Sequence, residues 1–172
     1  GQFRNFNYLY AFLATLWGII AKSEFMVRLP SAICGIISIF LIYKLGKLFF
    51  DRKAGLISAF ILAISPFHIY YSQEFRMYSL IITLTIASAY LFKKFLQSGR
   101  NRFLIGFMIF TIANIYIQVV TVSILMAEVL FFLFYLKKYR ALLKKWIIAH
   151  SLIAVFVLFQ FFSIINWLKP LS

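Results

Sequence analysis

Long apolar runs, separated by short polar clusters, set the pattern of the chain. Six of these runs approach the length of about 20 apolar residues that a membrane-spanning helix needs. They predict an all-α fold, a polytopic transmembrane helical bundle of about six spans plus one interfacial helix. The predicted spans lie near residues 29–50, 54–71, 77–95, 103–118, 119–136 and 146–168.

The fourth and fifth spans share one apolar run, and a single helix of that length would overshoot the bilayer. Basic clusters flank the run, at residues 100–102 and 137–140. If both clusters lie on the same membrane face, an even number of crossings must separate them. The pattern therefore predicts a tight hairpin that turns near Asn114–Thr121.

Positive charge is divided unequally between the two predicted membrane faces. By the positive-inside rule, the richer face is cytoplasmic. This orientation makes Arg28 and Ser72–Arg76 extracytoplasmic. Five basic residues fall on that poorer face, Arg4, Lys22, Arg28, Arg76 and Lys169, against thirteen in the Lys/Arg-rich loops: Lys44, Lys47, Arg52, Lys53, Lys93, Lys94, Arg100, Arg102, Lys137, Lys138, Arg140, Lys144 and Lys145.

Residues 1–28 are predicted to form an extracytoplasmic loop before the bundle of residues 29–172. Within this loop, Tyr8–Ala21 is apolar but short, and its aromatic side chains suit the headgroup zone, as in an interfacial juxtamembrane helix. The first span is expected to start at Arg28–Ser31, with Pro30 in its opening turn. Because the chain opens in mid-loop, we expect it to be a piece of a longer protein.

Composition excludes several classes of protein. The 172 residues are 64% hydrophobic and only 13% charged, whereas a soluble domain has about 45–50% apolar and about 25% charged residues. The net charge of +14 lies in short clusters that suit anionic membrane lipids, and no nucleic-acid partner is expected. A single cysteine, Cys34, excludes an internal disulfide framework. No metal site is predicted, and the need for a divalent metal stays open.

The polar stretch 65–78 is the best candidate for chemistry. Pro66 must kink or end the second span, and such irregularity at membrane depth requires protein or a wet cavity around it. Arg76 lies near the start of the next helix, where the helix dipole disfavours a cation, so an anion should compensate it. That anion is either Glu74, in a plain ion pair, or a ligand phosphate, which suits a guanidinium well. The candidate substrate-binding residues are Arg76, Glu74, Gln73, Tyr71, Tyr78 and His68.

Most of these side chains, and one further acid, also fit a purely structural role. His68 fits a hydrogen-bonded packing residue, and the tyrosines fit an interfacial girdle. Glu128 is the one acid deep in a predicted span, which is a functional hypothesis by default. We favour a protonated, hydrogen-bonded packing role for it, with Asn114, Gln118, His150 and Gln160 as candidate partners.

The ordered motifs resemble a known family. Arg28-Leu29-Pro30-Ser31-Ala32 comes first, Asp51-Arg52-Lys53-Ala54-Gly55-Leu56 follows, and Tyr71-Ser72-Gln73-Glu74-Phe75-Arg76-Met77-Tyr78 is the most specific run. Together they resemble the polytopic GT-C glycosyltransferases, in the branch of protein mannosyltransferases and bacterial aminoarabinose transferases. In one departure, residues 114–118 lack the histidine that relatives often carry there.

This resemblance implies transfer of a sugar from a polyprenyl-phosphate carrier to an extracytoplasmic glycan, lipid or protein acceptor. It places the general base in an acidic loop before Gly1, so no catalytic residue is expected within this chain, which alone should be inactive. Arg76 is the expected phosphate clamp. The lipid-linked sugar donor is the expected ligand, and no other cofactor is predicted.

Two other functions remain open. A transporter or flippase of a lipid-linked solute would use Glu128 and the helix broken at Pro66, and it should carry paired broken helices in two similar halves. A non-catalytic membrane scaffold would use the polar stretch for stability alone.

Overall fold

The computed structural model describes residues 8–168, with side chains for residues 9–162. All elements in this part of the chain are helical, which confirms the predicted all-α fold. The α-helices are α1 (Tyr8–Ile20), α2 (Glu24–Phe49), α3 (Arg52–Ala63), α4 (Pro66–Gln73), α5 (Tyr78–Ser98), α6 (Asn101–Ile117), α7 (Val122–Phe134), α8 (Leu136–Tyr139) and α9 (Leu143–Leu168), and the short 3-10 turns are η1 (Val119–Thr121) and η2 (Arg140–Leu142).

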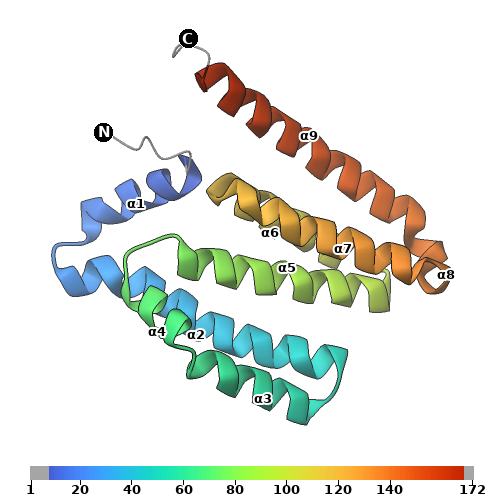
Figure 1. Ribbon diagram of the computed structural model, residues 1–172, viewed down its shortest axis with the longest axis horizontal. Coiled ribbons are helices and arrows are strands. Elements are labelled where there is room, and N and C mark those ends of the chain that lie inside the picture. The colour runs from blue at the N-terminus through green and yellow to red at the C-terminus, as the bar shows by residue number, and fades with distance from the viewer. Residues whose placement is uncertain (1–7, 169–172) are drawn as a thin grey trace.

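The long helices lie side by side in a bundle (Figure 1). Helix α2 packs against both α3 and α5, and α5 packs against α6. Helix α9 meets α6, and α1 meets α6 at the end of the bundle where α4 joins α5 (Figure 1).

Three helical stretches are long and apolar enough to cross a membrane, namely Glu24–Phe49, Tyr78–Ser98 and Leu136–Phe162. A fourth crossing results if α3 and α4, which meet at a bend of 60°, form one broken span. The predicted hairpin of residues 103–136 is present, but Asn101–Ile117 and Val119–Phe134 are shorter apolar helices. By length and composition the described residues thus give three or four of the six expected spans, because each arm of the hairpin is shorter than a full span.

Local signals mark where the helices begin and end. Asp51 caps α3 by accepting a hydrogen bond from the Ala54 amide at 2.7 Å. Gly99 ends α5 in the left-handed conformation, with φ of 63°. Pro66 occupies the first turn of α4, where its missing N–H is tolerated. The hairpin turn runs through Gln118, between the end of α6 and η1, inside the predicted range.

The start of the first span differs from the prediction. Helix α2 begins at Glu24, where Ser23 caps it and Glu24 pairs with Arg28 in the first turn. Pro30 therefore lies inside the helix and cannot donate to the carbonyl of Met26, four residues earlier. The indole N–H of Trp17 donates to that carbonyl at 2.8 Å instead. This bond allows the helix to continue through a proline, and it ties α1 to α2.

Aromatic side chains fill the core between α5, α6, α7 and α9. Phe95, Phe107 and Phe132 are fully buried. Trp146 stacks on Phe132 with ring centroids 4.4 Å apart and an interplanar angle of 8°. Dispersion and apolar burial thus hold the hairpin against its neighbours.

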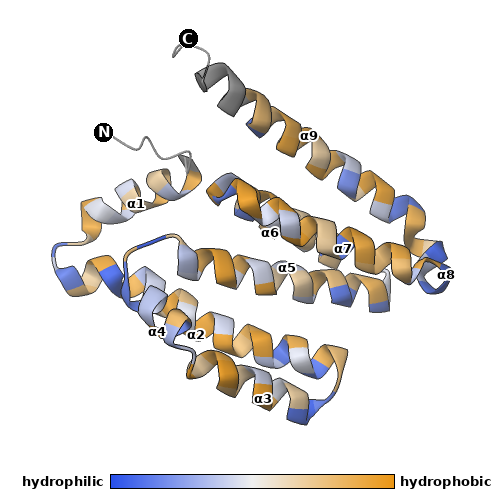
Figure 2. Cartoon of the chain, in the orientation of Figure 1, coloured by the Kyte–Doolittle hydropathy of each residue, from blue (hydrophilic) through white to orange (hydrophobic). Residues whose placement is uncertain are grey.

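Polar residues divide between the two ends of the bundle. The turns after α2 and α5 and the segment around α8 are hydrophilic and gather at one end, whereas the turn that contains Arg76 lies at the opposite end (Figure 2). The bundle thus separates the lysine-rich turns from Arg76, as the charge count predicts. Two of the counted basic residues, Arg4 and Lys169, lie outside the described residues.

Glycines allow α2 and α3 to approach closely. A Cβ atom on Gly55 would lie 2.6 Å from the carbonyl oxygen of Tyr43 and 3.0 Å from the amide nitrogen of Lys47. Both are backbone atoms of α2, which cannot move aside as a flexible side chain would. Close backbone packing through small residues is a common way for helices to associate in a membrane.

We predict that Gly55→Ala lowers the stability of the protein by about 1–3 kcal/mol, because overpacking outweighs the better helix propensity of alanine. The measurement is the midpoint of thermal unfolding in detergent. Gly18→Ala is the matched control, since a Cβ atom there meets nothing within 4 Å. An equal change for both variants would contradict close packing at Gly55.

Candidate functional site

Hydrogen bonds between α2, α4 and α5 form a polar junction next to the turn that connects α4 to α5. The Ser79 hydroxyl donates to the Tyr71 carbonyl at 2.7 Å, which links α5 to α4. The Thr83 hydroxyl lies 2.8 Å from the Cys34 carbonyl, which links α5 to α2. Because these bonds join three helices in an apolar region, they fix the position of residues 74–77 firmly.

His68 belongs to this junction and lies below the exposed turn. Its side chain is buried, and its Nε2 atom is 2.8 Å from the Ser38 hydroxyl of α2. This contact matches the packing interpretation. Gln73 has the opposite environment, because it lies exposed at the end of α4.

Arg76 and Glu74 form an ion pair at the tip of the turn. Arg76 Nε lies 3.1 Å from Glu74 Oε2, and the Arg76 side chain is 63% exposed. Glu74 is thus the anion that compensates Arg76 in this structure. A pair this exposed contributes little to stability, so the guanidinium is accessible to a second anion.

Tyrosines flank the ion pair. The rings of Tyr71 and Tyr78 lie 4.4 Å apart, and those of Tyr70 and Tyr71 lie 5.3 Å apart in an edge-to-face contact. The structure therefore groups Tyr71, Tyr78, Glu74 and Arg76 around one turn. Of the six predicted residues, His68 lies deeper and Gln73 lies at the edge.

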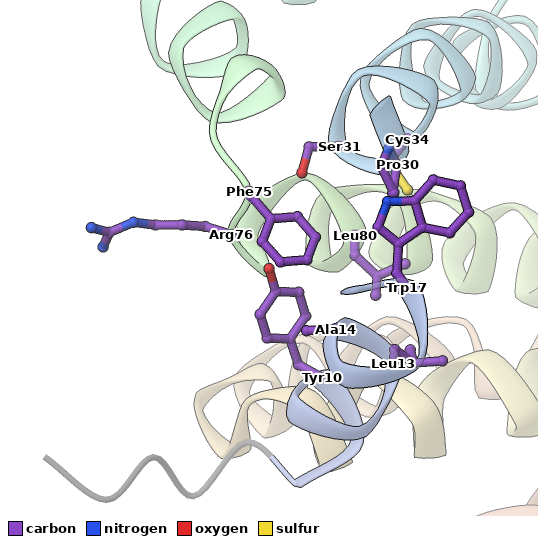
Figure 3. A pocket seen from close by; sticks show the side chains of 10 residues that line it. All are labelled: Tyr10, Leu13, Ala14, Trp17, Pro30, Ser31, Cys34, Phe75, Arg76 and Leu80. Carbon is purple, nitrogen blue, oxygen red and sulfur yellow. The ribbon is translucent and has the colours of Figure 1, made fainter. Parts of the chain in front are cut away.

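An apolar groove of about 260 Å³ opens beside the turn (Figure 3). Helix α1 forms one wall, and the start of α2 and the start of α5 form the others. In Figure 3 the guanidinium of Arg76 points out of the groove, so Arg76 lies at its rim. The lining residues are Tyr10, Leu13, Ala14, Trp17, Pro30, Ser31, Cys34, Phe75, Arg76 and Leu80.

Tyr10 places a phenol of α1 next to the turn. Its ring lies 6.0 Å from the Phe75 ring, and its hydroxyl oxygen is buried without a hydrogen-bond partner among the described residues. Burial raises the pKa of this hydroxyl, an effect that the nearby Arg76 guanidinium partly opposes. The hydroxyl therefore stays protonated at neutral pH, as a donor beside the turn that contains Arg76.

The groove residues of α1 are not among the six residues that the sequence predicts for the site. Tyr10 and Phe75 are far apart in sequence, and no spacing pattern links them. A partial signal was available in Pro30, whose position inside a helix leaves the Met26 carbonyl in need of a donor.

Glu128 lies away from this site, in a polar cluster between α5, α6 and α7. It is 8% exposed and lines a cavity of about 10 Å³ with Ser88, Thr111, Asn114 and Thr121. Of the candidate partners, Asn114 shares this cavity, whereas Gln160 bonds the Ile115 carbonyl and His150 packs on Trp146. No hydrogen bond joins Glu128 to any of these candidate partners among the described residues, and the Ser88 hydroxyl of α5 is the polar group that interacts with its carboxyl.

The fold is that of an all-α membrane protein with several long apolar helices. A family model described as dolichyl-phosphate-mannose-protein mannosyltransferase matches residues 6–167. The chain belongs to this family, which confirms the resemblance of its motifs. No curated protein and no solved structure gave a significant match.

We predict that Trp17→Phe loosens α1 from the bundle. The substitution removes the N–H that satisfies the Met26 carbonyl, and an unsatisfied buried carbonyl costs about 1–3 kcal/mol. Hydrogen exchange of the α1 amides, measured by mass spectrometry, should become at least about fivefold faster, since 1.4 kcal/mol is about tenfold. Phe12→Leu, at an exposed aromatic on the same helix, should leave exchange unchanged. Equal exchange rates in both variants would contradict a role of the Trp17–Met26 hydrogen bond in holding α1.

Proposed function

We propose that this protein transfers a sugar from a polyprenyl-phosphate carrier to an acceptor on the extracytoplasmic side of the membrane. Membership of the family supports glycosyl transfer in general. One observation carries the choice of donor: an exposed guanidinium lies at the rim of an apolar groove, at the end of the bundle opposite the lysine-rich turns. A lipid phosphate needs a cation for its phosphate and, next to it, an apolar surface for its hydrocarbon chain.

The groove suits the first isoprene units of the carrier. Its walls are almost entirely carbon, from Leu13, Trp17 and Leu80 among others. At its rim, Arg76 would bind the phosphate by charge-assisted hydrogen bonds, and the buried Tyr10 hydroxyl would add a neutral donor. Glu74 would hold the guanidinium in place through the observed ion pair. Tyr71 and Tyr78 would face the sugar, because aromatic rings pack well on sugar C–H groups.

The reaction exchanges one bond at the anomeric carbon for another. The acceptor hydroxyl oxygen forms the new bond to that carbon, while the bond from the carbon to the phosphate oxygen breaks and its electron pair stays on the phosphate. A general base takes the hydroxyl proton. Arg76 would lower the barrier by stabilising the charge that develops on the leaving phosphate.

The base is proposed to come from the acidic loop that the family resemblance places before Gly1. Residues 1–172 would then supply donor binding without the base, and would be inactive alone.

A transport function has less support. The bend between α3 and α4 is a single broken pair within the described residues, whereas the transporter hypothesis needs two in matching halves.

We predict that Arg76→Ala in the full-length protein lowers sugar transfer at least about a hundredfold, on the scale of losing one charge-stabilising donor at a transition state. Transfer from a radiolabelled polyprenyl-phosphate sugar in membranes measures the effect. Arg28→Ala removes the same charge at the same end but outside the groove, and should retain activity.

Two results would contradict the proposal. One is full transfer by Arg76→Ala. The other is a purified protein whose melting temperature does not respond to a saturating polyprenyl-phosphate analogue, which would favour the scaffold.

A further inference from the structure

A second, polar cavity of about 570 Å³ lies at the opposite, lysine-rich end of the bundle. It is formed by the last turn of α5 and by the α8–η2 segment. Lys93 and Lys138 line it, together with the polar groups of Gln97, Ser98 and Gly99. No acidic side chain lines the cavity.

Two ammonium groups that share a cavity without a carboxylate form a site for an anion. Lys138 lies close enough to Lys93 to repel it electrostatically. The nearest acid along the lysine-rich turns, Asp51, is already engaged in capping α3 at 2.7 Å. The repulsion between the two lysines is therefore uncompensated by the protein itself.

Aromatic rings hold these lysines in position. Lys93 Nζ lies 4.3 Å from the centroid of the Phe49 ring and 5.5 Å from that of Phe131. Lys138 Nζ lies 5.8 Å from the centroid of the Tyr139 ring. Cation–π contacts of this kind orient a flexible ammonium group, so less side-chain entropy is lost when an anion binds.

The position of the cavity, at the end of long apolar helices, favours a lipid as the source of the anion. The exposed rings of Phe49 and Phe134 lie at this end of the bundle, where hydrophilic turns join the apolar helices (Figure 2). Basic pockets between membrane helices at this level bind phosphorylated lipid headgroups.

We propose that this cavity binds the phosphate headgroup of an anionic phospholipid between Lys93 and Lys138, with hydrogen bonds from Ser98 and Gln97. The site is separate from the donor groove and does not depend on the proposed glycosyl transfer. It would anchor the α5–α6 turn and α8 to the leaflet on the lysine-rich face.

Native mass spectrometry of the full chain, with phosphatidylglycerol and phosphatidylcholine of the same acyl chains, tests the proposal. The double variant Lys93→Gln, Lys138→Gln should bind phosphatidylglycerol at least about tenfold more weakly, with phosphatidylcholine unaffected. Lys47→Gln, Lys144→Gln removes the same charge from exposed positions outside the cavity and should change binding much less. Equal loss in both double variants would show general surface attraction and overturn the site.

Three further measurements complete the test. If the first double variant does not fold, Lys138→Gln alone, at an exposed side chain, should weaken binding about fivefold, and unchanged binding would overturn the proposal. Lys93→Arg, Lys138→Arg should retain binding, because the charge is kept. Inorganic phosphate should raise the melting temperature less than phosphatidylglycerol; an equal rise would identify a free-phosphate site and overturn the lipid assignment.

Discussion

Inside an apolar bundle, every backbone carbonyl needs a hydrogen-bond donor from the protein itself, and the geometry of the site follows from this constraint. Pro30 lies inside α2 and removes the N–H that would satisfy the Met26 carbonyl, and hydrocarbon offers no other donor. At Pro30 the Trp17 indole supplies the missing donor, and this bond holds α1 across the start of α2. At Pro66 the helix bends by 60°, and the chain returns to α5 through the turn that contains Arg76. The groove exists because these two solutions bring α1 and the turn together.

The two ends of the bundle are chemically different, and the difference organises the ligands that we propose. At one end, an arginine with a single carboxylate partner borders an apolar groove. At the other, lysines face a polar cavity without an acid. Both arrangements suit a phosphate attached to a lipid. The two sites differ in the part of the lipid that we expect them to bind. The groove would take up part of a long isoprenoid chain, whereas the polar cavity would bind a headgroup.

Features determined by local chemistry could be predicted from the sequence. The break at Pro66 and the hairpin near Gln118 depend on neighbouring residues, and both were in the predicted place. The Glu74–Arg76 pair was foreseen as one of two alternatives. The contact of Tyr10 with Phe75 and the buried position of His68 against Ser38 could not be predicted, because they depend on how separate helices pack. Helix boundaries also differed from the prediction, since the Trp17 bond allows α2 to include Pro30 and the turn at η1 shortens the second arm of the hairpin to Val122–Phe134.

The central claim is that the groove beside Arg76 holds the carrier lipid, and cross-linking tests it most directly. A polyprenyl phosphate with a photoreactive group in its first isoprene units would be irradiated with the full-length protein in membranes, and the labelled peptides identified by mass spectrometry. The account predicts labels on α1 and on the starts of α2 and α5, at Leu13, Cys34 or Leu80, and their loss when unlabelled carrier competes. Labels confined to the outer faces of α3 and α9, unaffected by competitor, would contradict it.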